Sequence, residues 1–171
     1  MDIVTLGEAM ACLVPQSTGR LRHIRHFEKH VAGAELNLAV GAARLGLSVG
    51  WISRVGKDEF GAEILQVLRG EGVDVSQVQT SQRPTGVYFK EYSILGEPRV
   101  YYYRLGSAAT DLGPEDIVES YIADARVLHV TGITPLLSPS CHSAVTTAMQ
   151  VARQAGVTVV FDPNIRYKLI S

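Results

Sequence analysis

The segment from Val100 to Leu105 combines tyrosine and arginine side chains at a spacing that could hold a sugar-like ligand. Side chains alternate between two faces of an extended strand, so Tyr102 and Arg104 are predicted to share one face. Tyr88 is predicted to lie on the facing strand. Tyrosine hydroxyls suit a polyhydroxylated ligand, and the planar guanidinium of arginine suits a carboxylate. The same pattern also fits an exposed or dimer-forming hairpin, because tyrosines are common at interfaces.

A second candidate lies at Gly33, immediately before a predicted helix, with Asn37 one turn inside that helix. Glycine lets a ligand approach the backbone, and free N–H groups at the start of a helix bind oxygen ligands. An asparagine amide can both donate to and accept from a hydroxyl group. An ordinary loop-to-helix junction with a half-buried asparagine would produce the same short pattern.

Further polar residues follow predicted strands, at the edge where parallel α/β sheets bind ligands. Asn164 and Arg166 come just after an apolar run that ends at residue 161. The arginines at positions 104 and 166 together suit an acidic sugar, whereas a neutral sugar or nucleoside would not need them. Loop structure after a strand is the alternative for Asn164 and Arg166. Glu8 follows the first predicted strand and would either line the site or face solvent.

Several other chemistries are not supported by the sequence. Residues 56–61 do not form a phosphate-binding P-loop, since Asp58 stands where serine or threonine is needed. No Gly-x-Gly-x-x-Gly follows a predicted strand, which argues against a Rossmann nucleotide site. His23, His26 and His30 occupy a strand-like or loop segment, where their spacing does not converge, so no metal site is assigned. The absence of a nucleophile-elbow motif argues against a hydrolase.

Composition indicates one globular domain with no special affinity for polyanions. The 171 residues are 46% hydrophobic and 19% charged, with a net charge of −1. This balance gives no electrostatic case for binding nucleic acid or an anionic membrane, and no apolar window is long enough for a transmembrane helix. The two cysteines are far apart and in no metal or redox spacing, which favours reduced thiols and a cytoplasmic protein.

Strand and helix patterns alternate along most of the chain. Strands are predicted at 3–6, 12–14, 49–55, 85–94, 99–105, 127–130 and 156–161, and helices at 34–47, 61–70 and 139–154. In the first helix, core-facing spacing falls on Leu36, Val40, Ala43 and Leu47. Repeated strand–helix units favour a parallel sheet covered on both faces. Within residues 85–105 the side-chain pattern repeats every two residues, which predicts a β-hairpin joined at 95–98. No helix pattern follows the final strand, so the sheet is expected to be incomplete at Ser171.

The motif positions together resemble the PfkB (ribokinase-like) family of carbohydrate kinases. Asn37, Ala39, Gly46 and Gly56 fall in the register of the family signature, which then runs on to Gly61. The chain departs from the strict signature by one additional residue in Glu35-Leu36. That variant is similar to the 2-keto-3-deoxygluconate kinase branch of the family. The resemblance extends over all 171 residues, although members of the family are about twice this length.

The resemblance implies a three-layer α/β/α fold with a mainly parallel sheet and a small β lid. Residues 1–171 would form the N-terminal part of one domain, with lid segments at about 9–31 and 85–105. It implies ATP and Mg²⁺ as cofactors and a homo-oligomer paired through the lid, and no residue of this chain is assigned as a metal ligand. The substrate-binding residues that it implies are Gly33, Ala34, Glu35, Leu36, Asn37, Tyr88, Tyr102, Arg104 and Arg166, and the nucleotide-binding residues are Asn164 and Arg166.

The implied reaction is transfer of the ATP γ-phosphoryl group to a hydroxyl of an acidic sugar. Among acidic sugars, the resemblance favours 2-keto-3-deoxygluconate. The family's catalytic base is an Asp in a Gly-Ala-Gly-Asp motif, which this chain lacks. No catalytic residue is therefore assigned, and the isolated chain is expected to be inactive. A kinase for a neutral sugar or nucleoside and a non-enzymatic sugar-binding or dimerising half-domain remain as alternatives.

Overall fold

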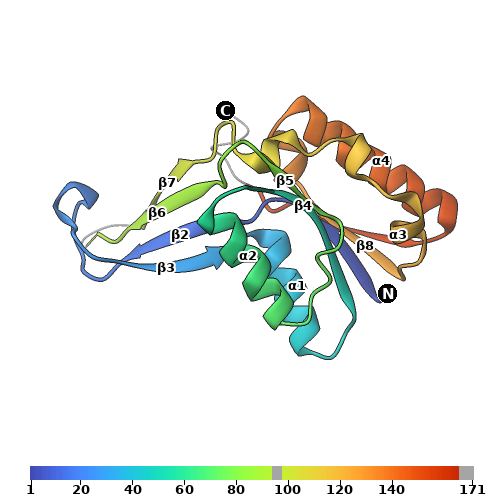
Figure 1. The fold of residues 1–171 in the computed structure, drawn as a ribbon, viewed down its shortest axis with the longest axis horizontal. Helices are drawn as coiled ribbons and strands as arrows, with labels where there is room; N and C mark the ends of the chain where they lie inside the picture. The colour runs from blue at the N-terminus through green and yellow to red at the C-terminus, as the bar shows by residue number, and fades with distance from the viewer. Residues whose placement is uncertain (94–97, 166–171) are drawn as a thin grey trace.

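The computed structural model describes residues 1–93 and 98–165, which form a broad α/β body and a projecting arm of strands (Figure 1). The strands are β1 (Ile3–Leu6), β2 (Met10–Pro15), β3 (Phe27–Ala32), β4 (Val49–Gly56), β5 (Val78–Ser81), β6 (Val87–Glu91), β7 (Arg99–Tyr103), β8 (Val127–Thr131) and β9 (Thr158–Asp162). The α-helices are α1 (Ala34–Arg44), α2 (Glu59–Gly70), α3 (Glu119–Ala123) and α4 (Pro139–Ala155). Short 3₁₀ helices span Leu21–His23, Ala108–Asp111, Pro114–Asp116 and Thr134–Leu136.

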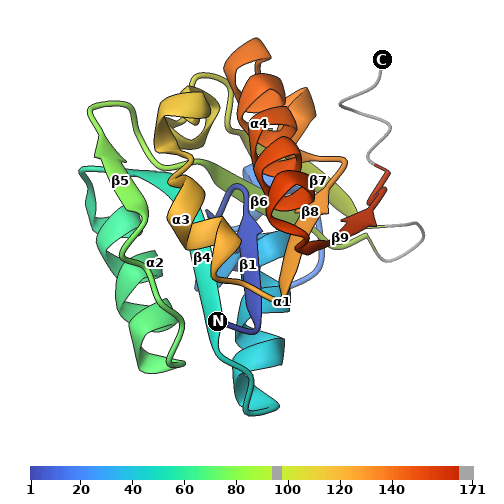
Figure 2. The ribbon, with the colours of Figure 1, turned by 90° about the vertical axis from the view of Figure 1, so that its right-hand side faces the viewer.

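The body is built on a five-stranded sheet in the order β5-β4-β1-β8-β9, and each neighbouring pair is parallel. Helices α1 and α2 cover one face, and α3 and α4 cover the other (Figures 1 and 2). This arrangement confirms the predicted three-layer α/β/α fold with a mainly parallel sheet. Parallel strands leave side chains on two covered faces, which is why β1, β4 and β8 are buried at nearly every position.

Each face of the sheet has its own hydrophobic core. On one side, Trp51 of β4 packs with Ile64 and Leu68 of α2, and all three are fully buried. On the other side, Leu128 of β8 belongs to a cluster that includes Ala144 and other small residues of α4. The small side chains let the helix approach the sheet closely, so the body is held mainly by apolar burial.

Helix α1 ends three residues before the predicted boundary at residue 47. Gly46 has φ +87°, and the N–H of Leu47 donates to the carbonyl of Ala42 over 3.1 Å. This is the hydrogen-bonding pattern of a Schellman C-cap, in which glycine supplies the left-handed residue. Leu47 therefore lies beyond the helix and is exposed, so its predicted core position is wrong. The small residues Ala39 and Ala42 face the sheet, while Val40 and Ala43 are only partly buried.

The arm is a four-stranded sheet in the order β3-β2-β6-β7, and we call it the lid (Figure 1). Strands β6 and β7 are antiparallel, as the predicted hairpin requires, and Tyr88 lies opposite Tyr102. Of the predicted connection at 95–98, residues 95–97 lie outside the described part of the chain. Both strands are shorter than predicted, so Thr85 and Arg104 lie at the base of the lid, next to the body.

Candidate functional site

Glu8 lies between the end of β1 and the start of β2, where the body passes into the lid. Its side chain is buried, with the residue only 3% exposed, and its carboxylate forms an ion pair with Nη2 of Arg104. The hydroxyl of Ser107 donates to the other carboxylate oxygen over 2.8 Å. Glu8 therefore does not face solvent, and it joins the first strand to the end of β7.

Two glycines leave room for Glu8. A Cβ atom at Gly33 would lie 2.5 Å from the Glu8 carbonyl oxygen, and one at Gly86 would lie 2.7 Å from Oε1 of Glu8. Both distances are shorter than real Cβ contacts. At Gly33 the obstacle is backbone, so that position requires glycine, whereas a Cβ at Gly86 would displace the Glu8 carboxylate. The close approach predicted for Gly33 thus occurs with the chain's own backbone.

The predicted aromatic residues lie beside this ion pair. The rings of Tyr88 and Tyr102 have centroids 5.5 Å apart, and the guanidinium of Arg104 lies 5.4 Å from the centroid of Tyr102. The structure therefore brings together Gly33, Tyr88, Tyr102 and Arg104 through Glu8 and its neighbours. Tyr102 is 39% exposed, so the surface that it forms with Tyr88 can be reached from solvent.

The ion pair places opposite charges in a largely buried environment. Burial raises the pKa of Glu8, while the charge of Arg104 and the hydrogen bond from Ser107 oppose this rise. The Nε atom of Arg104 is buried and has no hydrogen-bond partner within the described residues. An unpaired buried donor is costly, and here it belongs to the side chain best suited to bind a carboxylate.

Glu35 and Leu36 of the predicted binding segment have their side chains inside the body. Oε1 of Glu35 accepts hydrogen bonds from the hydroxyls of Thr131, over 2.6 Å, and Thr134, over 2.8 Å. Burial raises the pKa of Glu35, and these two hydrogen bonds oppose the rise. Leu36 belongs to the hydrophobic cluster between the sheet and α1. In this structure both side chains contribute to packing between elements, and half-buried Ala34 lies at the start of α1.

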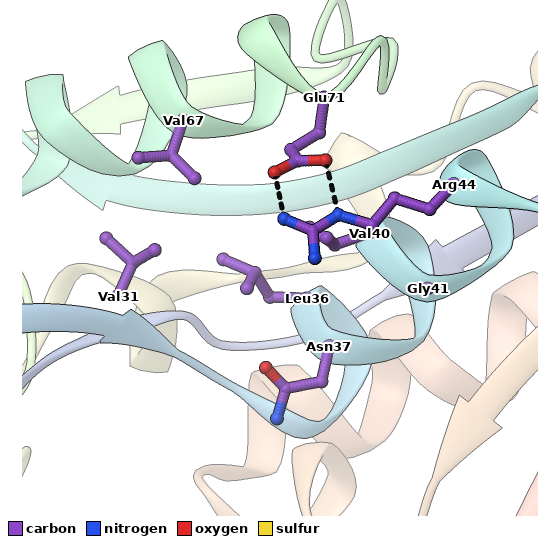
Figure 3. Close-up of a pocket in the computed structure, with 8 residues that line it drawn as sticks. All are labelled: Val31, Leu36, Asn37, Val40, Gly41, Arg44, Val67 and Glu71. Atoms are coloured by element: carbon purple, nitrogen blue, oxygen red, sulfur yellow. Dashed lines mark hydrogen bonds and ion pairs between the residues drawn. The ribbon is translucent and has the colours of Figure 1, made fainter.

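Asn37 lies on the exposed side of α1, in a groove between α1 and α2 (Figure 3). Arg44 and Glu71 join the two helices across this groove through hydrogen bonds of 2.8 Å and 2.5 Å. The residues that line the groove are Val31, Leu36, Asn37, Val40, Gly41, Arg44, Val67 and Glu71. Neither Glu8 nor Arg104 lines this groove, so the structure does not place Asn37 in the cluster around Glu8.

The predicted nucleotide contacts follow β9. The Asn164 amide Nδ2 donates to Oδ2 of Asp162 over 2.8 Å, and its backbone N–H donates to Oδ1 over 2.9 Å. Asn164 has φ +37°, a conformation that asparagine tolerates better than most residues. Arg166 lies outside the described residues. Because the Asn164 amide is already bound to Asp162, this arrangement does not by itself form a nucleotide site.

The motif at residues 56–61 holds the base of the lid. Asp58 caps α2 by accepting a hydrogen bond from the Gly61 N–H, and it also accepts from the N–H and hydroxyl of Thr85, each over 2.8 Å. The Thr85 hydroxyl in turn accepts from the Gly56 N–H. The sequence excluded a P-loop at residues 56–61, but it gave no link from this motif to Thr85 and did not point to Ser107. No local pattern marks Thr85 or Ser107, because their partners are distant in the chain.

The parallel three-layer body, with a lid at the carboxyl ends of its strands, defines a ribokinase-like α/β fold. The sequence profile of pfkB family carbohydrate kinases matches residues 1–171, and the chain belongs to this family.

Its relatives include sugar-acid kinases. The chain is 46% identical over 171 residues to a 2-dehydro-3-deoxygluconokinase of Bacillus subtilis, covering 99% of this chain and 53% of the relative. It is 43% identical over 169 residues to a 2-dehydro-3-deoxygluconokinase of Thermoproteus tenax, covering 97% of this chain and 51% of the relative. The chain thus spans about half the length of the curated relatives that it matches.

Solved structures confirm the fold. A PfkB protein from Polaromonas sp. superimposes with a TM-score of 0.94 at 44% identity, covering 98% of this chain and 57% of the other. A putative ribokinase II from E. coli, in complex with ATP and Mg²⁺, gives a TM-score of 0.87 at 26% identity, covering 98% and 54%. ATP and Mg²⁺ are therefore expected cofactors at the level of the family. Within the described residues, no helix is long and apolar enough to cross a membrane.

Proposed function

We propose that the protein to which this chain belongs is an ATP-dependent kinase for an acidic sugar, most specifically 2-keto-3-deoxygluconate. The observation that carries the proposal is the position of Arg104 beside Tyr88 and Tyr102 at the base of the lid. A cation beside two tyrosine rings, whose hydroxyls can form hydrogen bonds, suits a ligand with one carboxylate and several hydroxyl groups. The names of the curated relatives, both kinases of 2-dehydro-3-deoxygluconate, support the same substrate.

In this proposal, Arg104 binds the sugar carboxylate and the two tyrosines orient the hydroxyl groups. Arg166 supplies a second cation, and the segment from Gly33 to Asn37 approaches the sugar from the start of α1. Asn164 lies toward the nucleotide phosphates. When bound, ATP supplies the γ-phosphoryl group and Mg²⁺ neutralises charge on the phosphates. The phosphoryl group moves to a sugar hydroxyl oxygen, its bond to the β-phosphate oxygen breaks, and ADP leaves.

The hydroxyl proton must pass to a base that we do not assign within residues 1–171. We therefore propose that this chain alone does not turn over. Steady ADP release from the isolated chain, with ATP, Mg²⁺ and the sugar acid present, would contradict this proposal.

The substrate is tested in the protein at its natural length with a panel of 2-keto-3-deoxygluconate, fructose, ribose and a nucleoside. We expect the sugar acid to have the highest kcat/KM. Arg104→Gln combined with Glu8→Gln removes both charges of the buried pair and should raise KM for the acid at least tenfold. Tyr102→Phe tests the hydroxyl contact without changing charge, and Arg44→Gln on α1 is a matched control at an exposed ion pair. A preference for ribose or fructose that survives the double substitution would favour a kinase for neutral substrates.

We also propose that the protein is cytoplasmic and pairs with a second copy through its lid. Tyr101, Tyr103 and Leu105 are exposed apolar or aromatic side chains on or beside β7, which supports a contact there. Light scattering after size exclusion should give a dimer that Tyr103→Ser weakens. A monomer at micromolar concentration would contradict the pairing.

A non-enzymatic binding protein is the other alternative to a kinase. Binding of the sugar acid by the natural-length protein, without any phosphoryl transfer, would favour it.

A further inference from the structure

We infer that Glu8 is a specificity-determining residue, which competes with the carboxylate of an acidic substrate for the guanidinium of Arg104. The inference rests on the proposed function, since it concerns how the same site distinguishes acidic from neutral sugars. It begins from the buried ion pair between Oε2 of Glu8 and Nη2 of Arg104.

The surroundings of Glu8 hold its carboxylate in place. Ser107 donates to Oε1 over 2.8 Å, and the position of Gly86 leaves no room for even a Cβ beside the same oxygen. On the backbone side, Gly33 packs against the Glu8 carbonyl at a distance that also excludes a Cβ. Because the side chain is enclosed on several sides, we expect it to remain beside Arg104 when a ligand arrives.

A ligand carboxylate would therefore meet an arginine whose charge is already compensated. Some of its binding capacity remains, since Nε of Arg104 has no hydrogen-bond partner within the described residues. The ligand would nevertheless add a negative charge next to Glu8, and like charges in a buried site repel each other strongly. Glu8 thus lowers the affinity for an acid while leaving the affinity for a neutral sugar nearly unchanged.

Other titratable groups near Glu8 also interact with its charge. The buried carboxylate of Glu35 acts on Glu8 in the same direction as a ligand anion, and the thiol of Cys141 also senses the Glu8 charge. Arg104 is the cation that opposes them. Burial already raises the pKa of Glu8, and a bound carboxylate would raise it further. Protonation of Glu8 would relieve the repulsion, so binding of the acid should take up a proton and weaken as pH rises.

The test is a calorimetric titration of the natural-length protein, in wild type and Glu8→Gln. The two ligands are 2-keto-3-deoxygluconate and its neutral analogue, in which the carboxylate is reduced to a primary alcohol. Glutamine has nearly the same shape and can still accept from Arg104 while removing the negative charge. We expect Glu8→Gln to bind the acid on the order of tenfold more tightly, with little change for the neutral alcohol. Glu71→Gln is a matched control, because it removes one carboxylate from an exposed ion pair with Arg44.

A second measurement does not depend on the folding of the variant. Titrations of wild type in buffers of different ionisation enthalpy report the protons taken up on binding, and we expect uptake with the acid but not with the alcohol. Unchanged or weaker acid binding by a folded Glu8→Gln variant would overturn the inference, as would acid binding by wild type without proton uptake. If wild type binds neither the acid nor its alcohol, the proposed function fails first.

Discussion

The body and the lid are both β-sheets, but different interactions hold them together. Strand β4 of the body is buried along nearly its whole length, whereas β7 of the lid is exposed at all but one residue. The body gains stability from apolar side chains enclosed between sheet and helices. The lid depends more on backbone pairing and on ring contacts such as Phe89 with Tyr103, whose centroids are 5.7 Å apart.

The polar residues with the strongest interactions lie where these two regions meet. Glu8 pairs with Arg104 across this junction, and Asp58 binds Thr85 across it. Apolar burial in the body therefore supplies most of the stability, and the polar contacts at the junction orient the lid. The outer surface of the lid is exposed and contributes less to either. Substitutions in the three places should therefore have effects of different size and kind.

The largest loss of stability is expected from the core of the body. Leu128 is fully buried in β8, so Leu128→Ala should lower the free energy of unfolding by about 2–5 kcal/mol because it leaves a cavity. The control is Leu105→Ala, because Leu105 lies just beyond the end of β7 and is fully exposed. Its free energy of unfolding should change by no more than about 0.5 kcal/mol. Urea unfolding followed by circular dichroism measures both. Equal losses at the two leucines would refute the contrast between body and lid.

The next largest effect is expected at the junction. Asp58→Ala removes the N-cap of α2 and leaves the N–H of Thr85 without its acceptor, so we expect a loss of about 1–3 kcal/mol. Hydrogen exchange should increase in β6 and β7 more than in β8, because the lid loses its attachment to the body. Asp124→Ala, at an exposed side chain, should change neither quantity. An increase in exchange spread evenly over the body would show that Asp58 stabilises α2 alone.

A buried and an exposed carboxylate should change the stability of the protein with pH in opposite directions. Burial raises the pKa of Glu35 in the folded state above its usual value of 4.5, so the folded state binds more protons between these two pKa values. Stability therefore falls as pH rises through that window, and Glu35→Gln should gain stability relative to wild type over the same window. Arg44 lowers the pKa of Glu71, so its contribution is present above 4.5 and is lost as pH falls.

Glu71→Gln should accordingly show the opposite trend, losing stability relative to wild type as pH rises. Chemical unfolding at a series of pH values gives the difference between each variant and wild type, which cancels the titration of other residues. Parallel trends for the two variants would mean that burial does not control the titration of Glu35.

Local patterns were enough to predict most of the fold. Apolar runs predicted β1, β4, β8 and β9 of the body but not the short, polar edge strand β5, and the alternation of residues predicted the hairpin of β6 and β7. These features depend on neighbours within one element or on one short turn. The end of α1 was missed because periodicity alone continued to Leu47, while the left-handed Gly46 ends the helix.

The partners within the candidate site were harder to predict. Ser107 lies 99 residues from Glu8, so their hydrogen bond depends on the packing of the lid against β1. Glu35 and Asn37 are close in sequence, but the turn of the helix places one in the core and the other in the groove. The resemblance to a family predicted the residue types in the site, whereas their pairing required the three-dimensional structure.

The smallest effect is expected on the outer surface of the lid. Tyr103 is 69% exposed and contacts Phe89 edge to face, so Tyr103→Ala should cost about 0.5–1 kcal/mol through loss of the aromatic pair. Tyr103→Phe keeps the ring and should be close to neutral, which separates the ring contact from the hydroxyl. The same urea unfolding used for Leu128→Ala measures both variants, under conditions dilute enough to keep the protein monomeric. A loss from Tyr103→Ala as large as that from Leu128→Ala would mean that the lid has a core of its own, because a mostly exposed ring cannot otherwise contribute as much as a fully buried leucine.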